Sequence, residues 1–408
     1  MNKNELLRNL PSVDSLLLSK KGNELVNSYG HKRVSACVKD ILDDIRKKIL
    51  AGVEDVDFEI MPLLEKELNR ERGIRRVINA TGILLHTNLG RAPMAEEAVQ
   101  AVLRATMGYS NLEFNLEDGK RGSRLDGVSE VLKKLFNVEA ALAVNNNAAA
   151  VLLMLSSLAK DKEVVVSRGE LVEIGGSFRI PEVMEQSGAH LKEVGSTNKT
   201  HAFDYERAIN ENTAAILKVH TSNYSIKGFT EQLDIAALRK IADKYELPLF
   251  YDIGSGAILS LSKYGLSDEP LVKKSLRDGA DVVCFSGDKL LCASQAGIVV
   301  GKAEYIEKMK RHPLYRALRL DKMCLTALEK SLELYLDEEH AEKRLPLYAM
   351  LSLSEDELKK RADKLAKRLF VKGVDAVSLR LSGLCGGGSC PDEEIPSYGI
   401  AIKSENPD

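Results

Sequence analysis

Between about residues 95 and 330, short apolar segments alternate with segments of helical periodicity, and this alternation constrains the fold most strongly. Strands are expected at residues 140–144, 163–167, 191–194, 214–220, 249–253, 280–285 and 297–300. Helices are expected at residues 95–107, 128–136, 148–159, 180–187, 235–245 and 271–278. Strands that are apolar throughout are typical of a mostly parallel sheet covered on both faces. The sequence therefore predicts an α/β fold.

The flanking regions have a different pattern. Residues 1–70 show helical periodicity, because Val34, Val38, Ile41 and Ile45 recur at spacings of three and four. After about residue 325 we expect two helices (325–336 and 354–370) and two strands (376–381 and 398–402). We therefore predict a helical N-terminal domain, a linker, a large α/β domain and a small α+β lobe, with bounds 1–62, 63–90, 91–330 and 331–408. The chain ends within the expected small lobe, which we therefore expect to be incomplete.

Composition narrows the class of protein. No run approaches the roughly 18 to 20 apolar residues of a membrane helix, and the polar start lacks a signal core, so we expect a cytoplasmic protein. Six scattered cysteines favour reduced thiols. The net charge is −2, but residues 1–50 hold 10 Lys/Arg and 6 Asp/Glu, a balance of +4. That basic head suits either an RNA-contacting appendage or an ordinary helical head with solvated lysines.

A lysine just past a predicted strand is the first candidate for chemistry. The segment Phe285-Ser286-Gly287-Asp288-Lys289 forms a small polar turn after the strand at 280–285. A lysine in such a place can form a Schiff base with an aldehyde cofactor. The alternative is a surface lysine in a loop.

Other strand ends supply companions for this lysine. Asp252 follows the strand at 249–253 and suits pairing with the ring nitrogen of pyridoxal phosphate (PLP). Asn145, Asn146 and Asn147 begin an Ala-rich helix whose N–H groups suit a phosphate, although they could simply cap that helix. Along the chain, the helix for the phosphate comes first, then the acid for the ring nitrogen, then the lysine for the Schiff base. This is the order found in the large PLP superfamily with an aspartate-aminotransferase-like fold. His220 ends a further strand, where that superfamily contacts cofactor or substrate.

Several long blocks make the resemblance specific. They are LPSVDSLL (10–17), RRVINATGILLHTNLGRAP (75–93), YSNLEFNLEDGKRGSR (109–124), VNNNAAAVLL (144–153), SRGELVEIGGSFRIP (167–181), KVHTSNYSIKGF (218–229), FSGDKLL (285–291) and HPLYRALRLDKM (312–323). Through these blocks the chain resembles the bacterial selenocysteine synthases, the L-seryl-tRNA(Sec) selenium transferases, over nearly its whole length.

The resemblance implies a reaction and its partners. The family converts L-seryl-tRNA(Sec) to L-selenocysteinyl-tRNA(Sec) with PLP and selenophosphate, through an aminoacrylyl-tRNA. It implies that Lys289 holds PLP and removes the Cα proton, with Ser286 among the cofactor contacts. Asp288 is a candidate to assist the departing hydroxyl, or else an ion-pair or turn residue. No metal is expected.

Arginines are the expected ligands of selenophosphate, because guanidinium groups bind phosphate bidentately. The resemblance points to Arg91, Arg316 and Arg319, and the last two would share one face of a helix. Arg121 and Arg124 are further candidates, and a surface ion pair is the alternative for each. The family also implies a homo-oligomer, a pentamer of dimers.

One loop departs from the family pattern. Family members usually have Gly-Gly-Pro where this chain has Cys292-Ala293-Ser294, just after the lysine turn. The loop must then take another path, or the same path under strain. Two other functions stay open: a small-molecule PLP lyase, such as an ammonia lyase on a phosphorylated amino acid or amino sugar acid, and a non-catalytic RNA-binding paralogue.

Overall fold

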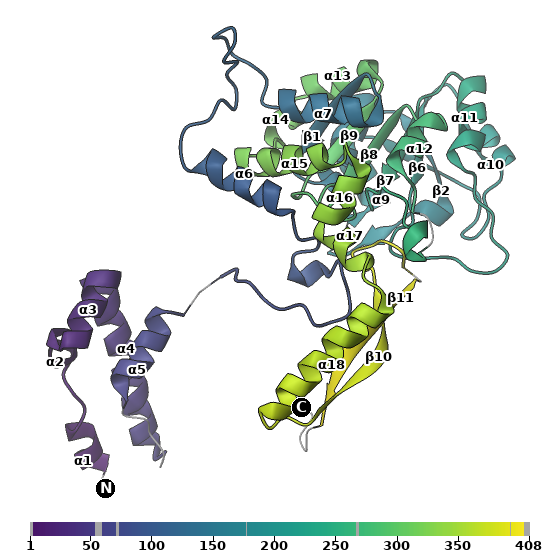
Figure 1. The fold of residues 1–408 in the computed structure, drawn as a ribbon. Coiled ribbons are helices and arrows are strands. Elements are labelled where there is room, and N and C mark those ends of the chain that lie inside the picture. Colours follow the sequence, from purple (N-terminus) through teal and green to yellow (C-terminus); the bar gives the residue numbers. More distant parts are fainter. Residues whose placement is uncertain are drawn as a thin grey trace. The chain divides into compact units, whose positions relative to one another are not determined.

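The computed structural model describes residues 3–53, 59–70, 73–176, 178–266, 269–391 and 393–403 of the chain (Figure 1). The chain end at Asn406–Asp408, on which the expectation of an incomplete lobe rests, lies outside the described residues. By its contacts the chain divides into two units, Met1–Ile78 and Asn79–Asp408.

The first unit is helical. Its helices are α1 (Lys3–Arg8), α2 (Val13–Leu18), α3 (Lys20–Tyr29), α4 (His31–Ala51) and α5 (Ile60–Leu68). Ser12 caps α2 by accepting a hydrogen bond from the Ser15 N–H. One apolar stripe of α4 is buried, and Leu64 and Leu68 of α5 belong to the same core. Helix α5 belongs to this unit and continues past residue 62, where the sequence analysis ended the first domain. The predicted domain bounds stay a prediction.

A seven-stranded sheet organises the second unit. Its strands lie in the order β1-β9-β8-β7-β6-β2-β5. Their bounds are β1 (Ala140–Val144), β2 (Glu163–Ser167), β5 (His190–Val194), β6 (Thr213–Val219), β7 (Leu249–Ile253), β8 (Val282–Ser286) and β9 (Gly297–Gly301). All neighbours are parallel except that β9 runs antiparallel to both β1 and β8. The predicted strands and their mostly parallel arrangement are confirmed.

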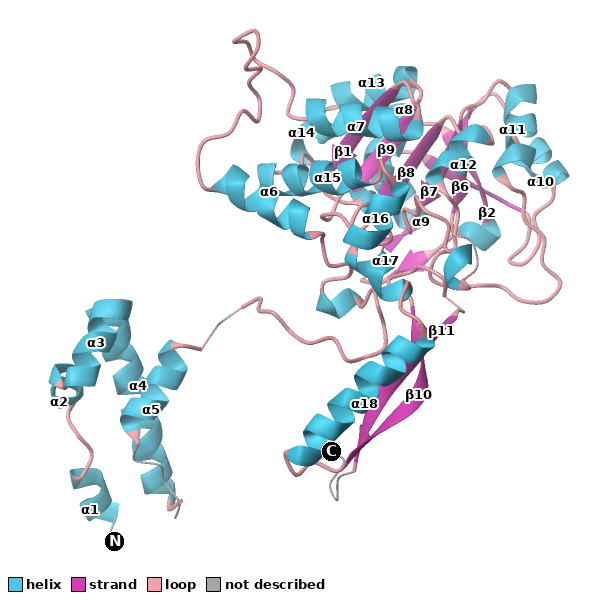
Figure 2. Cartoon of the chain, viewed as in Figure 1, coloured by secondary structure: helices cyan, strands magenta, loops and turns pink. Residues whose placement is uncertain are grey.

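Helices lie on both faces of this sheet (Figure 2). The helices of this part of the chain are α6 (Glu96–Thr106), α7 (Asp126–Phe136), α8 (Asn147–Leu158), α9 (Ile180–Ser187), α10 (Ala202–Ala208), α11 (Ile235–Lys244), α12 (Val272–Arg277), α13 (Ala303–Arg311), α14 (Pro313–Ala317), α15 (Lys322–Leu334), α16 (Glu338–Arg344) and α17 (Pro346–Leu351). The neighbouring strands β7, β8 and β9 inside the sheet are buried along their whole length, which explains why their sequences are mostly apolar without alternation. Two-residue strands β3 (Glu173–Ile174) and β4 (Phe178–Arg179) pair outside the sheet.

The C-terminal part of this unit is a two-stranded antiparallel ribbon covered by one helix. Strands β10 (Ala376–Leu384) and β11 (Glu394–Ile402) pair along their length, and α18 (Glu355–Val371) packs on both. Both strands are longer than the sequence predicted. Leu384 and Cys385 also bond to residues 82–85 through Leu384 N–H to Gly82 O and Leu85 N–H to Cys385 O. The segment after β10 is thereby tied to the α/β part.

Among the described residues, no helix has the length and apolar character needed to cross a membrane. All six cysteines are free thiols.

Candidate active site

Three parallel strands bring the candidate residues to one edge of the sheet. Lys289 follows β8, Asp252 lies within the last two residues of β7, and His220 follows β6 directly. Since these strands are parallel neighbours, their carboxyl ends meet. Ser286, the last residue of β8, is buried beneath the lysine turn. The structure therefore brings these predicted residues together at one edge of the sheet.

Lys289 is buried, with 5% of its surface exposed. Burial lowers the pKa of its amine, and the positive charge of Arg91 lowers it further, while Asp252, Asp288 and Glu269 oppose both effects. A larger fraction of the amine is therefore uncharged at neutral pH than for a solvated lysine. An uncharged amine is the form that attacks an aldehyde or accepts a proton.

Asp252 is a buried carboxylate held by two donors. Asn147 Nδ2 donates to Asp252 Oδ1 at 2.7 Å, and Cys284 Sγ donates to the same oxygen at 3.7 Å. Burial raises the pKa of Asp252 to about 6, while the Asn147 hydrogen bond and the charge of Lys289 oppose the rise. A cationic ring nitrogen placed here would stabilise the ionised form.

The three asparagines at the start of α8 have different partners. Asn146 caps the helix by accepting the Ala149 N–H at 2.9 Å, and the Asn145 N–H donates to Leu318 O at 2.9 Å. Asn147 turns to Asp252 instead. The sequence assigned all three to the phosphate end, but the geometry places the Asn147 side chain at the ring-nitrogen acid and uses the Asn146 side chain as a helix cap.

Asp288 and Arg91 form an ion pair beside the lysine. Arg91 Nη1 donates to Asp288 Oδ2 at 2.7 Å, and the Ala92 N–H donates to Asp288 O at 3.3 Å. Arg91 has a φ of 61°, an unusual value for a residue with a side chain, and its own N–H donates to His86 O. Asp288, in the turn after β8, thus contacts both the Arg91 guanidinium and the backbone of the next residue, Ala92.

Sequence reasoning missed Glu269, which lies against His220. Glu269 is buried, and its Oε2 is 3.7 Å from His220 Nδ1. Burial lowers the pKa of His220, although the Glu269 carboxylate opposes this. No motif pointed to Glu269, because it stands in a loop before α12 and reaches the site only through the fold.

A triglycine loop after β10 also reaches the site. Gly386, Gly387 and Gly388 all have positive φ values, of 75°, 65° and 73°. A methyl group on Gly388 would lie 3.4 Å from both Lys289 Nζ and Ser222 Oγ. Three consecutive glycines are the signal that could have indicated this close approach of backbone to a site.

A buried ion pair supports β6 from behind. Lys218 Nζ donates to Glu170 Oε1 at 2.6 Å, and the Val219 N–H donates to Glu170 Oε2 at 3.1 Å. Glu170 belongs to the turn after β2, so this pair joins the ends of two neighbouring strands.

The remaining arginine candidates are not joined to Lys289 by any contact among the described residues. Arg121 and Arg124 both pair with Glu113, and Arg319 Nη1 lies 3.6 Å from Glu113 Oε1. Arg316 is exposed on α14. The expectation that Arg316 and Arg319 share a helix face is wrong, because α14 ends at Ala317 and Arg319 lies beyond its cap, Leu318.

The site residues fit PLP. Several buried polar atoms around the site have no hydrogen-bond partner in the described part of the chain, among them Asn147 Oδ1, His220 Nδ1, Ser222 Oγ, Ser255 Oγ and Glu269 Oε2. A methyl group on Gly254 would lie 2.9 Å from Ser222 Oγ and 3.7 Å from Lys289 Nζ, so the lysine amine is flanked by backbone without side chains. Unpaired polar atoms around an amine and a carboxylate suit a polar ligand.

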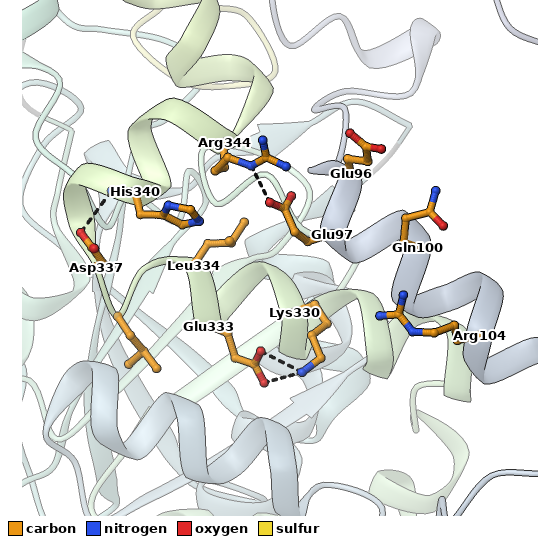
Figure 3. A pocket seen from close by; sticks show the side chains of 11 residues that line it. Glu96, Glu97, Gln100, Arg104, Lys330, Glu333, Leu334, Asp337, His340 and Arg344 are labelled. Carbon is orange, nitrogen blue, oxygen red and sulfur yellow. Dashed lines mark hydrogen bonds and ion pairs between the residues drawn. The ribbon is translucent and has the colours of Figure 1, made fainter.

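A separate surface pocket lies between α6 and the segment from α15 to α16 (Figure 3). Its charges pair with one another: Arg344 with Glu97, and Lys330 with Glu333 at 2.7 Å. We assign no chemistry to it.

The fold is that of the PLP-dependent transferases, the aspartate-aminotransferase-like class, as the sequence predicted. Among solved structures, D-glucosaminate-6-phosphate ammonia-lyase is similar, with a TM-score of 0.58 and 20% identity over 81% of this chain and 80% of that chain. At that identity the likeness establishes the fold alone.

Sequence comparison identifies the family. Residues 77–408 match the family model described as L-seryl-tRNA selenium transferase, and residues 7–46 match that of the selenocysteine synthase N terminus. The L-seryl-tRNA(Sec) selenium transferase of Clostridium botulinum (strain Loch Maree / Type A3) is 48% identical over 99% of this chain and 89% of the relative. That of Caldanaerobacter subterraneus subsp. tengcongensis is 49% identical over 98% and 88%. The chain belongs to the L-seryl-tRNA selenium transferase family, whose cofactor is PLP.

Proposed function

We propose that the chain converts L-seryl-tRNA(Sec) to L-selenocysteinyl-tRNA(Sec), with PLP as cofactor and selenophosphate as selenium donor. Family membership supports the reaction. The structural observation that carries it is the buried Lys289 amine beside the Asp252 carboxylate, which Asn147 holds at 2.7 Å.

Each of these residues has a defined task. When bound, PLP supplies an electron sink that makes the serine Cα–H acidic. The Lys289 amine, kept partly uncharged by burial, accepts that proton. Asp252 keeps a ring nitrogen protonated, and Asn147 orients Asp252. The surrounding buried strand ends exclude water from the reacting atoms.

We assign Asp288 a positioning role. Its Oδ2 accepts a charge-assisted hydrogen bond from Arg91, and an acid that donates a proton to the leaving hydroxyl would have to be protonated. Asp288 therefore holds the Arg91 guanidinium in place. Arg91 is the best-placed ligand for the phosphate group of selenophosphate. Arg316 and Arg319 remain candidates for the same task.

We assign tRNA contact to the helical head. A hollow on this unit between α4 and α5 is lined by five basic residues, Arg33, Lys48, Lys66, Arg70 and Arg75, and by three acidic ones, Asp40, Asp44 and Glu67. An excess of positive charge attracts the phosphate backbone.

Self-association is also part of the proposal. The outer side of α6 and the segment after it expose large apolar side chains: Val99, Leu103, Met107, Tyr109 and Leu116. Exposed large apolar side chains on one helix and in the loop after it suit a protein interface. We propose a homo-oligomer built from two-fold dimers, with five dimers in a ring, acting in the cytoplasm.

The proposed reaction is tested by offering the PLP-loaded protein three substrates: seryl-tRNA(Sec), seryl-tRNA(Ser) and free serine. Each is incubated with and without selenophosphate, and the aminoacyl product is identified by mass spectrometry. Selenocysteine should form only on tRNA(Sec) and only with selenophosphate. Release of ammonia from free serine, without any selenocysteine, would instead indicate a small-molecule lyase.

A further inference from the structure

Glu269 is a buried side chain in the site to which the proposed reaction gives no role. It lies in the loop between the 3-10 turn Ser262–Tyr264 and α12, and 6% of its surface is exposed. Its Oε1 accepts the Cys390 N–H at 2.6 Å. Its Oε2 has no hydrogen-bond partner among the described residues and faces His220 Nδ1 at 3.7 Å. A buried carboxylate oxygen without a hydrogen-bond partner costs free energy. The two oxygens of Glu269 therefore have to be explained separately, Oε1 by the Cys390 N–H and Oε2 by His220.

The first contact concerns the triglycine loop, residues 386–388. Glycines contribute no side chains that could anchor this loop, and they leave its backbone conformationally free. At its start, Cys385 O accepts the Leu85 N–H at 2.8 Å. At its end, the Cys390 N–H donates to Glu269. Glu269 is thus the side-chain anchor of a loop whose Gly388 lies against the Lys289 amine.

The second contact concerns the hydrogen on His220. The charged groups that face this ring are Glu269, Lys218 and Lys289. Burial lowers the pKa of His220, which favours the neutral ring, and a neutral imidazole has one donor and one acceptor nitrogen. A carboxylate opposite Nδ1 selects the form with hydrogen on Nδ1 and leaves Nε2 as an acceptor.

We propose that Glu269 is a positioning residue that joins the triglycine loop to His220. It holds the loop over the Lys289 amine, and its negative charge both fixes the hydrogen of His220 on Nδ1 and stabilises a protonated nitrogen at Lys289. The inference rests on the proposed function insofar as Lys289 is the lysine that carries PLP.

Two variants and a control separate these effects. Glu269→Gln keeps an oxygen for the Cys390 N–H but removes the charge, and Glu269→Ala removes both. Glu231→Gln is the control, because Glu231 pairs with His201 at 2.9 Å outside the site. Hydrogen–deuterium exchange of the peptide 385–391 is measured in the full chain, and the pH midpoint of the visible absorption band is measured in the PLP-loaded protein.

Exchange of the loop peptide should become about tenfold faster in Glu269→Ala and change less than about twofold in Glu269→Gln. The midpoint should fall in both variants, because a negative charge that favours the protonated lysine nitrogen is gone. A fall of about half a unit corresponds to a roughly threefold loss of proton affinity. Glu231→Gln should change neither quantity.

Unchanged exchange in Glu269→Ala would overturn the anchoring role. An unchanged midpoint in Glu269→Gln, or an equal shift in Glu231→Gln, would overturn the electrostatic role, and this holds even if Glu269→Ala does not fold. A wild-type protein without any visible band would contradict the proposed function, whereas the exchange measurement would still decide whether Glu269 holds the loop.

Discussion

Cys292 stands in a backbone conformation that favours glycine, and its replacement measures the strain in the loop after Lys289. Its φ is 55°, and its N–H donates to Lys289 O at 3.0 Å. The next residue, Ala293, donates its N–H to Gly287 O at 2.8 Å. The loop therefore follows a tight turn that a residue with a Cβ occupies at a cost of roughly 1–2 kcal/mol.

The free energy of this backbone strain can be measured by comparing two variants that both remove the sulfur atom. Cys292→Ala keeps the Cβ and its strain, whereas Cys292→Gly removes both. Glycine also loses about 0.5–1 kcal/mol through the greater freedom of the unfolded chain. The Gly variant also loses a buried methyl group, worth about 0.8 kcal/mol, so it should be about as stable as the Ala variant, to within about 0.5 kcal/mol. Both should be less stable than wild type, because the Cys292 side chain is fully buried.

Ala293 provides the matched control, because it is buried in the same loop without a positive φ. Ala293→Gly should lower stability by roughly 1–2 kcal/mol, through chain entropy and one lost methyl group. Urea unfolding at one protein concentration and saturating PLP gives the free energies from midpoints and slopes. If Cys292→Gly were less stable than Cys292→Ala by the same roughly 1–2 kcal/mol that Ala293→Gly costs, the strain would be refuted.

Three further predictions concern the site and the head. Without PLP, the contribution of Asp252 to the unfolding free energy should fall by about 2.4 kcal/mol between pH 4 and pH 7, because burial raises the pKa of Asp252 from 3.8 to about 6 and the folded state resists losing this proton. Calorimetry at both pH values should find that the wild type loses more stability over this range than Asp252→Asn, by that amount. In denaturant titrations, Glu170→Gln should lower the unfolding free energy by about 3–5 kcal/mol, because the variant leaves Lys218 buried without its counter-charge. Replacing both Glu170 and Lys218 by apolar residues should lower the unfolding free energy less. Deleting residues 1–78 should preserve the visible PLP band but weaken tRNA(Sec) binding and flatten its salt dependence in filter-binding assays; equal affinity would exclude a tRNA role for the head.

The sheet could be predicted because its strands carry an unambiguous signal. Residues 140–144, 163–167 and 249–253 are short, mostly apolar segments, and the observed strands have the same ends. Parallel order then brings Asp252 and Lys289 to one edge, which is why their proximity followed from the sequence.

Contacts that depend on distant backbone could not be predicted in this way. Asn147 sits in a helix-start motif that suits a phosphate, and only the packing of α8 on the sheet shows its side chain reaching Asp252. Glu269 has no motif around it, and Gly388 follows Lys289 by about a hundred residues. The early end of α14, which separates Arg319 from Arg316, is likewise not visible in their spacing of three.

The identity of the cofactor lysine tests the central claim most directly. Borohydride reduction of the PLP-loaded protein, digestion and mass spectrometry locate the lysine that carries the reduced cofactor. The geometry predicts the adduct on Lys289 alone, and its loss in Lys289→Ala. Lys218, the other buried lysine near this edge of the sheet, is occupied by Glu170 and should carry none. An adduct on Lys218 or any lysine other than Lys289 would contradict the site described for this chain.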